Sequence, residues 1–187
     1  MKLKDMKIYI VTSNYDDYAA FKYSFKMHNN VTVINDDFVS FMGEEGKNID
    51  VIVSPANCYG EMDGGYDAAI SDYLGWDFQK NVQKYIKDNF YGEQIVGTSF
   101  IIDAPKGKKL IHTPTMIVPS VIKDEKIIYT SMRSTLICSL KNNIKSIVLP
   151  VFGTGTGGVS SSVSAKLSLK AYNQILNAQN GEYRYYN

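Results

Sequence analysis

The sequence predicts an α/β layer fold with a mostly parallel central sheet. Segments with strand and helix character alternate along the 187 residues, which is typical of this class. Two strand-like segments, "DVIVSP" and "SIVLPVF", are almost continuously apolar instead of alternating, which indicates strands that are covered on both faces. With 44% hydrophobic residues, a chain of this length supplies one core and does not require a second domain.

The first part of the chain predicts three strands and one helix. "KIYIVTS" is a short strand, and the helix after it is expected to begin at Asn14, a residue type that caps helices, with Asp17 three residues on. Tyr18, Phe21 and Phe25 then recur at helical spacing. The next two strands, "VTVIND" and "DVIVSP", are expected at residues 31–36 and 50–55.

The remaining part continues the alternation. Residues 67–90 predict one helix or two, because Phe78, Val82 and Ile86 share a helical face while Gly75 can break or bend the front end. The other expected elements are strands at 95–103 and 109–118, a helix at 130–143, a strand at 146–152 and a helix at 160–176.

Charge and composition exclude several classes of function. Lysine and arginine total 20 against 19 acidic residues, so no strongly basic groove is implied and a nucleic-acid partner is not expected. Cys58 and Cys138 form no disulfide framework, and no signal peptide or membrane-length apolar run is present, so a cytoplasmic protein without a membrane partner is expected. With His28 and His112 as the only histidines and no paired Cys/His spacing, metal-independent, cofactor-free chemistry is expected.

A glycine-rich loop, "PVFGTGTGGVSSS", lies between a predicted strand and a predicted helix. In parallel sheets such loops lie at the ligand-binding edge, and four glycines within residues 153–158 let the backbone N–H groups approach an anion closely. Val159 follows where a Walker A loop needs lysine, so a nucleoside triphosphate site of that type is excluded. A dinucleotide fold is also disfavoured, because too few residues remain for a second strand with its acidic residue.

The loop after "DVIVSP" carries a second group of candidate residues. Asn57 offers both a hydrogen-bond donor and an acceptor at a strand end, which suits the hydroxyls of a ribose. Gly64 and Gly65 precede a helix start, a position that favours anions. Asp67 has two interpretations: an acidic residue that favours the first helical turn, or a carboxylate that orients or activates a water.

These two segments, "DVIVSPAN…GGYDAAI" and "IVLPVFGTGTGG", resemble the two motifs of the macro domain family. The order and spacing of both motifs agree, from about Val31 to Tyr172. The resemblance implies a three-layer α/β/α fold with a mixed, mostly parallel sheet, built by residues 1–187 as one domain with 179–187 as a flexible tail. It also implies an ADP-ribose ligand, which some members only bind and others hydrolyse from a derivative.

The resemblance also implies roles for individual residues. The adenine amino group is expected at Asp37, with Asp36 as the neighbouring alternative, and the distal ribose at Asn57. Asp67 and Asn57 are the expected catalytic pair. The implied ligand-binding set is Asp37, Phe38, Ala56, Asn57, Gly64, Gly65, Tyr66, Val151, Phe152, Gly153, Thr154, Gly155, Thr156, Gly157, Gly158 and Val159.

The chain departs from the family pattern at several positions. Ser54 and Pro55 replace an Asn-Ala pair, and Asp63 lies where glycine is common; it is either a solvated turn residue or an alternative acid/base. Gly157 takes the place of an aromatic that covers the distal ribose, for which Tyr59 or Tyr66 are possible substitutes, and a final strand is missing or reduced to "GEYRYYN". His112 is expected to be structural. Cys58 as a nucleophile is less favoured than Cys58 as a small loop residue.

The resulting hypothesis is a protein that binds ADP-ribose and hydrolyses an ADP-ribosyl derivative without a metal. Candidate substrates are a mono-ADP-ribosylated protein, ADP-ribose 1″-phosphate and O-acetyl-ADP-ribose. A non-catalytic ADP-ribose reader is the alternative, and a protein-interaction domain that kept only the fold is a third hypothesis. The presence of Asp67 favours the enzyme.

Overall fold

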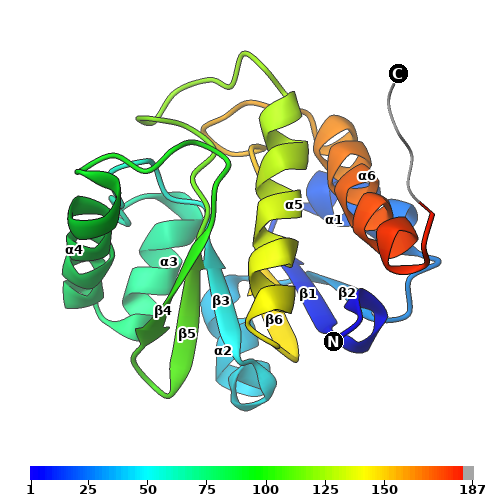
Figure 1. Ribbon diagram of the computed structural model, residues 1–187, viewed down its shortest axis with the longest axis horizontal. Helices are drawn as coiled ribbons and strands as arrows, with labels where there is room; N and C mark the ends of the chain where they lie inside the picture. Colours follow the sequence, from blue (N-terminus) through cyan, green and yellow to red (C-terminus); the bar gives the residue numbers. More distant parts are fainter. Residues whose placement is uncertain (183–187) are drawn as a thin grey trace.

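The computed structural model describes residues 1–182, and six strands in that part of the chain form one sheet (Figure 1). The strand order is β2-β1-β6-β3-β5-β4, and β4 alone runs antiparallel to its neighbour. The mixed, mostly parallel sheet that we predicted is therefore confirmed. The strands are β1 (Lys7–Thr12), β2 (Val31–Asn35), β3 (Val51–Ser54), β4 (Phe100–Ala104), β5 (Lys108–His112) and β6 (Ser146–Leu149).

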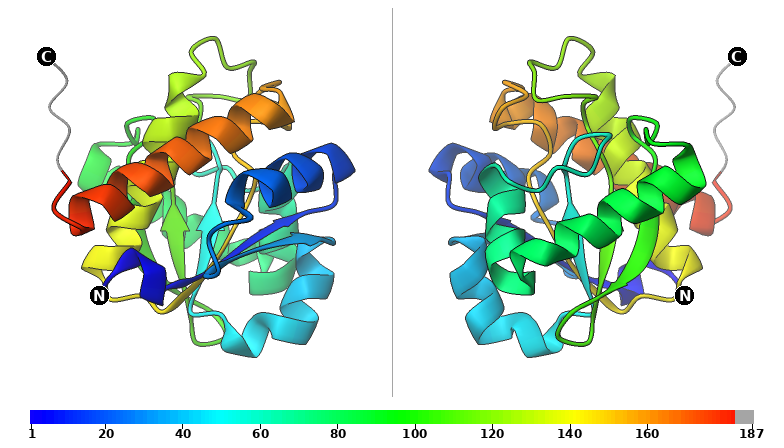
Figure 2. Two further views of the ribbon diagram at one scale, coloured as in Figure 1. Left: turned by 90° about the vertical axis from the view of Figure 1, so that its right-hand side faces the viewer. Right: turned by 90° about the vertical axis from the view of Figure 1, so that its left-hand side faces the viewer.

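Helices cover both faces of this sheet, so the three-layer α/β/α prediction is also confirmed (Figure 2). None of the helices within residues 1–182 is long and apolar enough to cross a membrane. The α-helices are α1 (Tyr15–Phe25), α2 (Phe38–Glu45), α3 (Gly65–Leu74), α4 (Gln79–Phe90), α5 (Lys126–Lys141) and α6 (Ser161–Gln179), and short 3₁₀ turns are η1 (Leu3–Asp5), η2 (Gly46–Asn48) and η3 (Trp76–Phe78).

The two helical layers create two apolar cores. One core packs α1, α5 and α6 against the sheet through residues such as Phe21, Met132 and Tyr172. The other packs α2, α3 and α4 against the opposite face through residues such as Phe41 and Ile70. Strands β3 and β6 lie in the middle of the sheet and are buried at every position, which explains why their sequences show no polar alternation.

Several elements differ from the sequence prediction; β4 begins at Phe100 instead of residue 95, and α5 begins at Lys126 instead of residue 130. Helix α2 was not predicted; Asp37 caps its first turn by accepting a hydrogen bond from the Ser40 backbone N–H. Residues 67–90, predicted as one helix or two, belong to two α-helices, because Gly75 adopts a φ of +100° between them. Strand β5 ends at His112 instead of residue 118, since Pro114 has no N–H to continue the ladder.

Another difference is at the C-terminus. Helix α6 extends to Gln179, beyond the predicted end at residue 176, and the Gln179 Oε1 atom accepts a hydrogen bond of 2.7 Å from the Leu3 N–H. The expected tail at 179–187 is therefore anchored where it begins. Residues 183–187, which hold most of "GEYRYYN", lie outside the described part of the chain.

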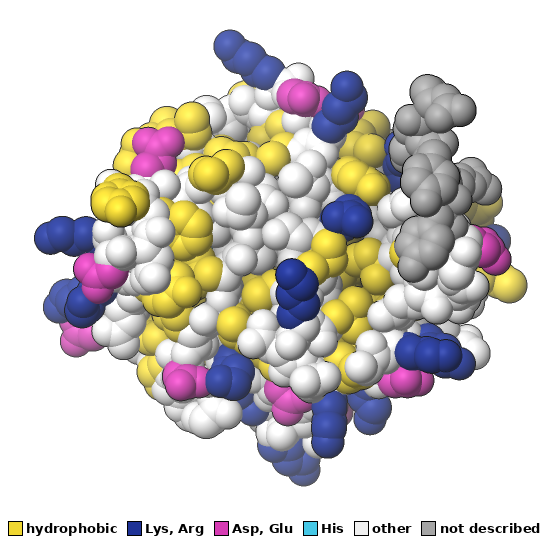
Figure 3. Space-filling view, viewed as in Figure 1, with side chains coloured by type: hydrophobic (Ala, Val, Ile, Leu, Met, Phe, Trp, Pro, Cys, Tyr) yellow, Lys and Arg dark blue, Asp and Glu magenta, His cyan; other side chains and the backbone are white. Residues whose placement is uncertain are grey.

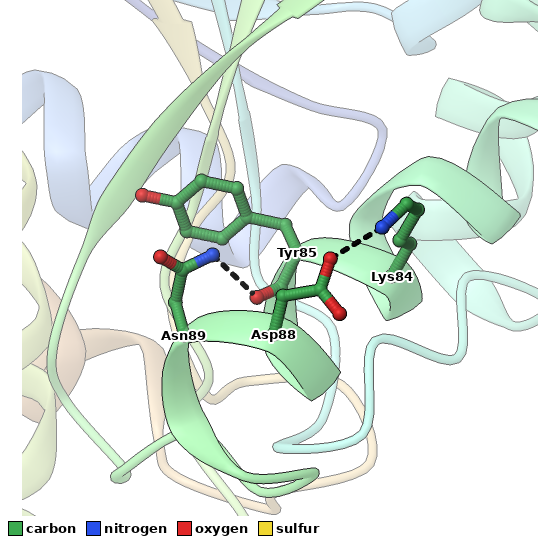
Figure 4. Close-up of polar contacts among 4 residues, drawn as sticks. All are labelled: Lys84, Tyr85, Asp88 and Asn89. Atoms are coloured by element: carbon green, nitrogen blue, oxygen red, sulfur yellow. Dashed lines mark hydrogen bonds and ion pairs between the residues drawn. The ribbon is translucent and has the colours of Figure 1, made fainter.

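The outer face of α4 is an ordinary solvated helix surface (Figure 4). Lys84 and Asp88 form an exposed i,i+4 ion pair, and the Asn89 side chain donates a hydrogen bond of 3.0 Å to the Tyr85 carbonyl. Exposed pairs of this kind contribute little to stability. Nothing on this face points to a ligand.

Asp17 joins α1 to the glycine-rich loop and to the first residue of α6. This buried carboxylate accepts hydrogen bonds from the hydroxyls of Thr154 (2.8 Å) and Ser161 (2.6 Å). The Asn14 side chain caps the same helix, as predicted, by accepting from the Asp16 and Asp17 N–H groups. Asp17 therefore faces the glycine-rich loop instead of completing a local capping box.

We expect Asp17→Ala to lower the free energy of unfolding by about 1–3 kcal/mol, because it leaves two partly buried hydroxyls without their acceptor. Urea unfolding measures this change. Asp16→Ala is the matched control in the same helical turn, where the side chain is exposed and a change within about 0.5 kcal/mol is expected. Equal effects of the two substitutions would show that the Asp17 contacts do not stabilise the fold.

Candidate functional site

A cavity of about 530 Å³ opens at the carboxyl edge of the parallel strands. Residues that follow β2, β1, β6, β3 and β5 line it, because the ends of parallel strands meet at one edge of a sheet. Its volume lies within the range of small-molecule sites. The lining residues are Val11, Thr12, Ser13, Asp17, Asp36, Asp37, Phe38, Pro55, Ala56, Asn57, Glu61, Asp63, Gly64, Gly65, Tyr66, Asp67, Ala69, Thr115, Met116, Pro119, Pro150, Val151, Gly153, Thr154, Gly155, Thr156 and Gly157.

The glycine-rich loop lines this cavity and contains unused backbone donors. Within the described part of the chain, no N–H group from Gly153 to Gly157 donates a hydrogen bond. The loop is instead closed by the N–H groups of Gly158 and Val159, which donate to the carbonyls of Gly155 and Gly153 at 3.0 Å each. Successive free N–H groups of this kind form an anion-binding concavity.

Two glycines in this loop leave no room for a side chain. Gly153 has a φ of +81°, and a Cβ atom there would lie 2.4 Å from Ile128 Cδ1. A Cβ atom on Gly157 would lie 2.6 Å from the Gly153 carbonyl oxygen and 2.7 Å from Ile122 Cδ1. Ile122 therefore occupies the space beside Gly157.

Asn57 is buried and shapes the turn that follows β3. Its Oδ1 atom accepts hydrogen bonds from the N–H groups of Tyr59 (3.1 Å) and Glu61 (3.3 Å), and its Nδ2 atom donates to Glu61 Oε2 at 2.6 Å. The second Nδ2 hydrogen remains free for a ligand, since an amide group carries two. The predicted ribose contact would use this hydrogen.

Asp67 lies in the first turn of α3 and is only 6% exposed. Its Oδ1 atom accepts a hydrogen bond of 2.6 Å from the Ser54 hydroxyl, and Oδ2 has no such partner within residues 1–182. Burial raises the pKa of Asp67 to about 7; the Ser54 hydrogen bond opposes this rise and the charge of Asp63 adds to it. A carboxylate with a pKa near neutrality is suited to general base chemistry.

The residues expected to contact adenine follow β2 and also line the cavity. Asp37 accepts two hydrogen bonds from Ser40, from the backbone N–H at 2.9 Å and from the hydroxyl at 2.6 Å, which lowers the pKa of Asp37. Asp36 accepts one hydrogen bond of 2.8 Å from the Asp37 N–H. Both carboxylates line the cavity, so the two alternatives remain open.

Most of the predicted ligand-binding residues line the cavity, but three do not. The Phe152 and Val159 side chains are buried in the core with α5 and α6, and Gly158 lies outside the lining. The residues that the prediction missed include Thr12, Ser13, Asp17, Thr115, Met116 and Pro119. Most of these residues reach the cavity because they lie at or after the ends of β1 and β5, and no local sequence motif identifies them.

Cys58 and His112 do not line the cavity. Burial, with a smaller effect of the Glu93 charge, raises the pKa of the Cys58 thiol to about 11, so the nucleophilic thiolate is suppressed near neutral pH. Burial lowers the pKa of His112 to about 3, and its Nδ1 atom is hydrogen-bonded to Gln94. No group of three His, Cys, Asp or Glu residues within residues 1–182 is placed to hold a metal ion.

Comparison with known proteins identifies the family. The family model for the macro domain matches residues 53–168, which is more than half of the chain. The chain belongs to the macro domain family. An uncharacterized protein of Aquifex aeolicus is 33% identical over 120 residues, covering 63% of this macro domain and 68% of the relative.

Solved macrodomains share the fold. An Oceanobacillus iheyensis macrodomain with ADP is 23% identical, with a TM-score of 0.59 over 69% of this chain and 70% of that chain. A mutant of that macrodomain with ADPR is 18% identical, with a TM-score of 0.62 over 94% and 82%. The macrodomain of Mycobacterium tuberculosis DarG is 22% identical, with a TM-score of 0.58 over 68% and 83%.

Of the two tyrosines considered as substitutes for the aromatic of the family pattern, Tyr66 lines the cavity and Tyr59 does not. The Tyr59 hydroxyl donates to Glu93 at 2.9 Å, and Tyr59 does not line the cavity. The Tyr66 ring packs on Phe38 with 5.1 Å between ring centroids and forms part of the cavity wall. The hydroxyl of Tyr66 is buried without a hydrogen-bond partner, and burial keeps its pKa well above the ordinary value.

The raised pKa of Asp67 predicts a pH-dependent stability. The folded protein binds the Asp67 proton more tightly than the unfolded chain does, so this group lowers the free energy of unfolding as the pH rises from about 4 to about 7. We expect Asp67→Asn to remove this loss. The difference in free energy of unfolding between Asp67→Asn and wild type should increase from about pH 4 to about pH 7 and stay constant at higher pH. The upper limit of this difference is about 4 kcal/mol.

Urea unfolding between pH 4 and pH 9 measures this difference. The exposed Asp16→Asn is the matched control. An Asp67→Asn profile parallel to that of wild type would show that burial does not penalise the ionised carboxylate.

Proposed function

We propose that this macro domain binds ADP-ribose and hydrolyses an ADP-ribosyl derivative. One observation carries the proposal: a single cavity is lined both by residues 153–157, whose N–H groups are free, and by Asp67 with its buried carboxylate. The related Oceanobacillus iheyensis structures with ADP and with ADPR support the ligand class.

The order of the strands suggests the direction of the ligand. The glycine-rich loop follows β6, which lies between β1 and β3 in the sheet. A diphosphate on that loop has β1 and β2 on one side, with Asp36 and Asp37, and β3 on the other, with Asn57 and Asp67. The adenosine therefore extends towards the first pair, and the distal ribose extends towards the second.

In this pose Asp67 acts as the base for an attacking water. Its Oδ2 atom, which is free of other hydrogen bonds in the described residues, accepts a proton from the water as the water oxygen bonds to C1″. The bond from C1″ to the oxygen of the substituent breaks, and that oxygen takes a proton from solvent. A positioned base contributes about 10²–10⁴-fold to the rate of such a reaction.

A non-catalytic reader is the second candidate function. Asp67 is only 6% exposed, which restricts the access of water to its carboxylate. The same cavity would then bind ADP-ribose without turnover. Measurement of product release from ADP-ribosylated substrates distinguishes the two functions.

We expect titration calorimetry to show ADP-ribose binding to the wild type and its loss in Gly155→Glu. A Cβ atom at Gly155 meets nothing within 4 Å, so the variant should fold while its carboxylate opposes the diphosphate. Affinity should fall at least about 100-fold, because like charges in contact cost several kcal/mol. Gly43→Glu, on α2 and equally unobstructed, is the matched control. Unchanged affinity of Gly155→Glu would mean that the loop does not hold the diphosphate.

We expect Asp67→Ala to lower kcat by about 10²–10⁴-fold while it leaves the affinity for ADP-ribose almost unchanged. In the wild type, kcat/KM should rise with pH and level off above about pH 7, because only the ionised form of Asp67 accepts a proton. Parallel measurement of Asp63→Ala distinguishes the two neighbouring carboxylates. A larger loss in Asp63→Ala would assign the base to Asp63 instead.

A further inference from the structure

Strand β2 forms an open edge of the sheet. Its only neighbouring strand within residues 1–182 is β1. In the left-hand view of Figure 2 this edge faces the viewer, with no helix across it. An open edge exposes backbone N–H and C=O groups that can pair with another strand.

The usual protection against such pairing is missing from β2. Natural edge strands carry charged residues, proline or a β-bulge, which prevent a second strand from adding. The five residues of β2, "VTVIN", include no charge and no proline, and their register with β1 is continuous. Charged side chains of both signs are spread over the face of the molecule in Figure 3, so the uncharged edge is a local feature.

The even-numbered residues of β2 form its hydrogen bonds to β1. The Asn30 carbonyl accepts from the Ile8 N–H at 2.9 Å, and the Asp36 N–H donates to the Thr12 carbonyl at 3.1 Å. Residues two positions apart in a parallel ladder bond to the same neighbour, and this alternation continues between the two positions. The odd-numbered residues therefore direct their N–H and C=O groups away from β1.

The outward groups of β2 form a self-complementary set. The Val31 N–H already donates to the His28 carbonyl at 2.9 Å, which leaves the Val33 and Asn35 N–H groups without an acceptor in the described part of the chain. In an antiparallel pair of two β2 strands with Val33 opposite Val33, each Val33 N–H donates to the other Val33 carbonyl, and each Asn35 N–H donates to a Val31 carbonyl. Four hydrogen bonds form, and every outward N–H group then has an acceptor.

The charges beside the strand favour the antiparallel arrangement over a parallel one. Lys26 precedes β2, and Asp36 and Asp37 follow it. An antiparallel partner brings the acidic end of one strand towards the basic end of the other, whereas a parallel partner brings like charges together. The two-fold axis of such a pair produces the favourable contact twice.

We infer that the edge of β2 is the contact surface for a second copy of this chain, in a two-fold dimer with a continuous sheet. The inference does not depend on the ligand of the cavity. A strand of an unrelated protein could satisfy the same backbone groups, but the match of opposite charges at the two ends of β2 is a property of this chain. Because each copy contributes one five-residue strand, the contact is small and the dimer is reversible.

Amide hydrogen exchange, measured by NMR, tests the dimer in the unmodified chain. The N–H groups of Val33 and Asn35 should exchange about tenfold more slowly at high than at low protein concentration, because only the dimer protects them. The N–H groups of Thr32 and Ile34 are the internal controls, since they bond to β1 at every concentration. Sedimentation equilibrium on the same samples should show the mass rising towards that of two chains.

The variant Val33→Pro removes the central outward N–H, which is not used in the ladder to β1. We expect it to weaken dimerisation about tenfold or more, because each dimer loses two hydrogen bonds. Val33→Ala is the matched control: it shortens the same side chain and keeps the N–H, so its dimerisation should stay close to that of wild type. Circular dichroism checks that both variants are folded.

Three results would overturn the inference. A wild type that remains monomeric, with Val33 and Asn35 exchanging equally fast at all concentrations, would leave the edge to a strand of another protein. Slow exchange of both at every concentration would show that another segment of the same chain covers the edge. A dimer that persists in folded Val33→Pro would place the interface elsewhere.

Discussion

Five parallel strands end at one edge of the sheet, and the candidate site depends on this alignment. Each strand continues into a loop at that edge, so segments from 11–17 to 150–157 meet around one cavity although they are far apart in the sequence. The helices on both faces bury β3 and β6 completely and thereby fix the positions of the two central loops. The rigid sheet holds these loops in place, and the loops carry the residues for binding and catalysis.

The cavity is acidic, yet its proposed ligand is an anion. Six carboxylates and no basic side chain line it. The attraction for a diphosphate must therefore come from the backbone, through the unused N–H groups of residues 153–157. Asp17 contributes indirectly, since its carboxylate accepts the hydroxyls of Thr154 and Ser161 and holds the loop against α1. The absence of cations in this lining favours recognition by shape and hydrogen bonds over recognition by net charge.

Two opposing effects set the chemistry of Asp67. Burial beneath the first turn of α3 disfavours its charged form, and the hydroxyl of Ser54 stabilises that form through one hydrogen bond. Burial is the larger effect, so the pKa of Asp67 moves into the range in which a carboxyl group can exchange protons at neutral pH. Ser54, which replaces the asparagine of the family pattern, is therefore part of the site as the partner of Asp67.

The sequence by itself determined the α/β class and located the two loops that line the cavity, with Asn57, Asp67 and most of the glycines in them. Apolar runs and turn residues are local signals, which a sequence shows directly. It did not predict α2, in which Gly43 and Ser40 weaken the helical pattern. Only the tertiary structure decided that Asp17 holds the glycine-rich loop and that the loop after β5 closes the site. Those contacts join residues more than 50 positions apart in almost every case, and only the packing of the strands brings such residues together.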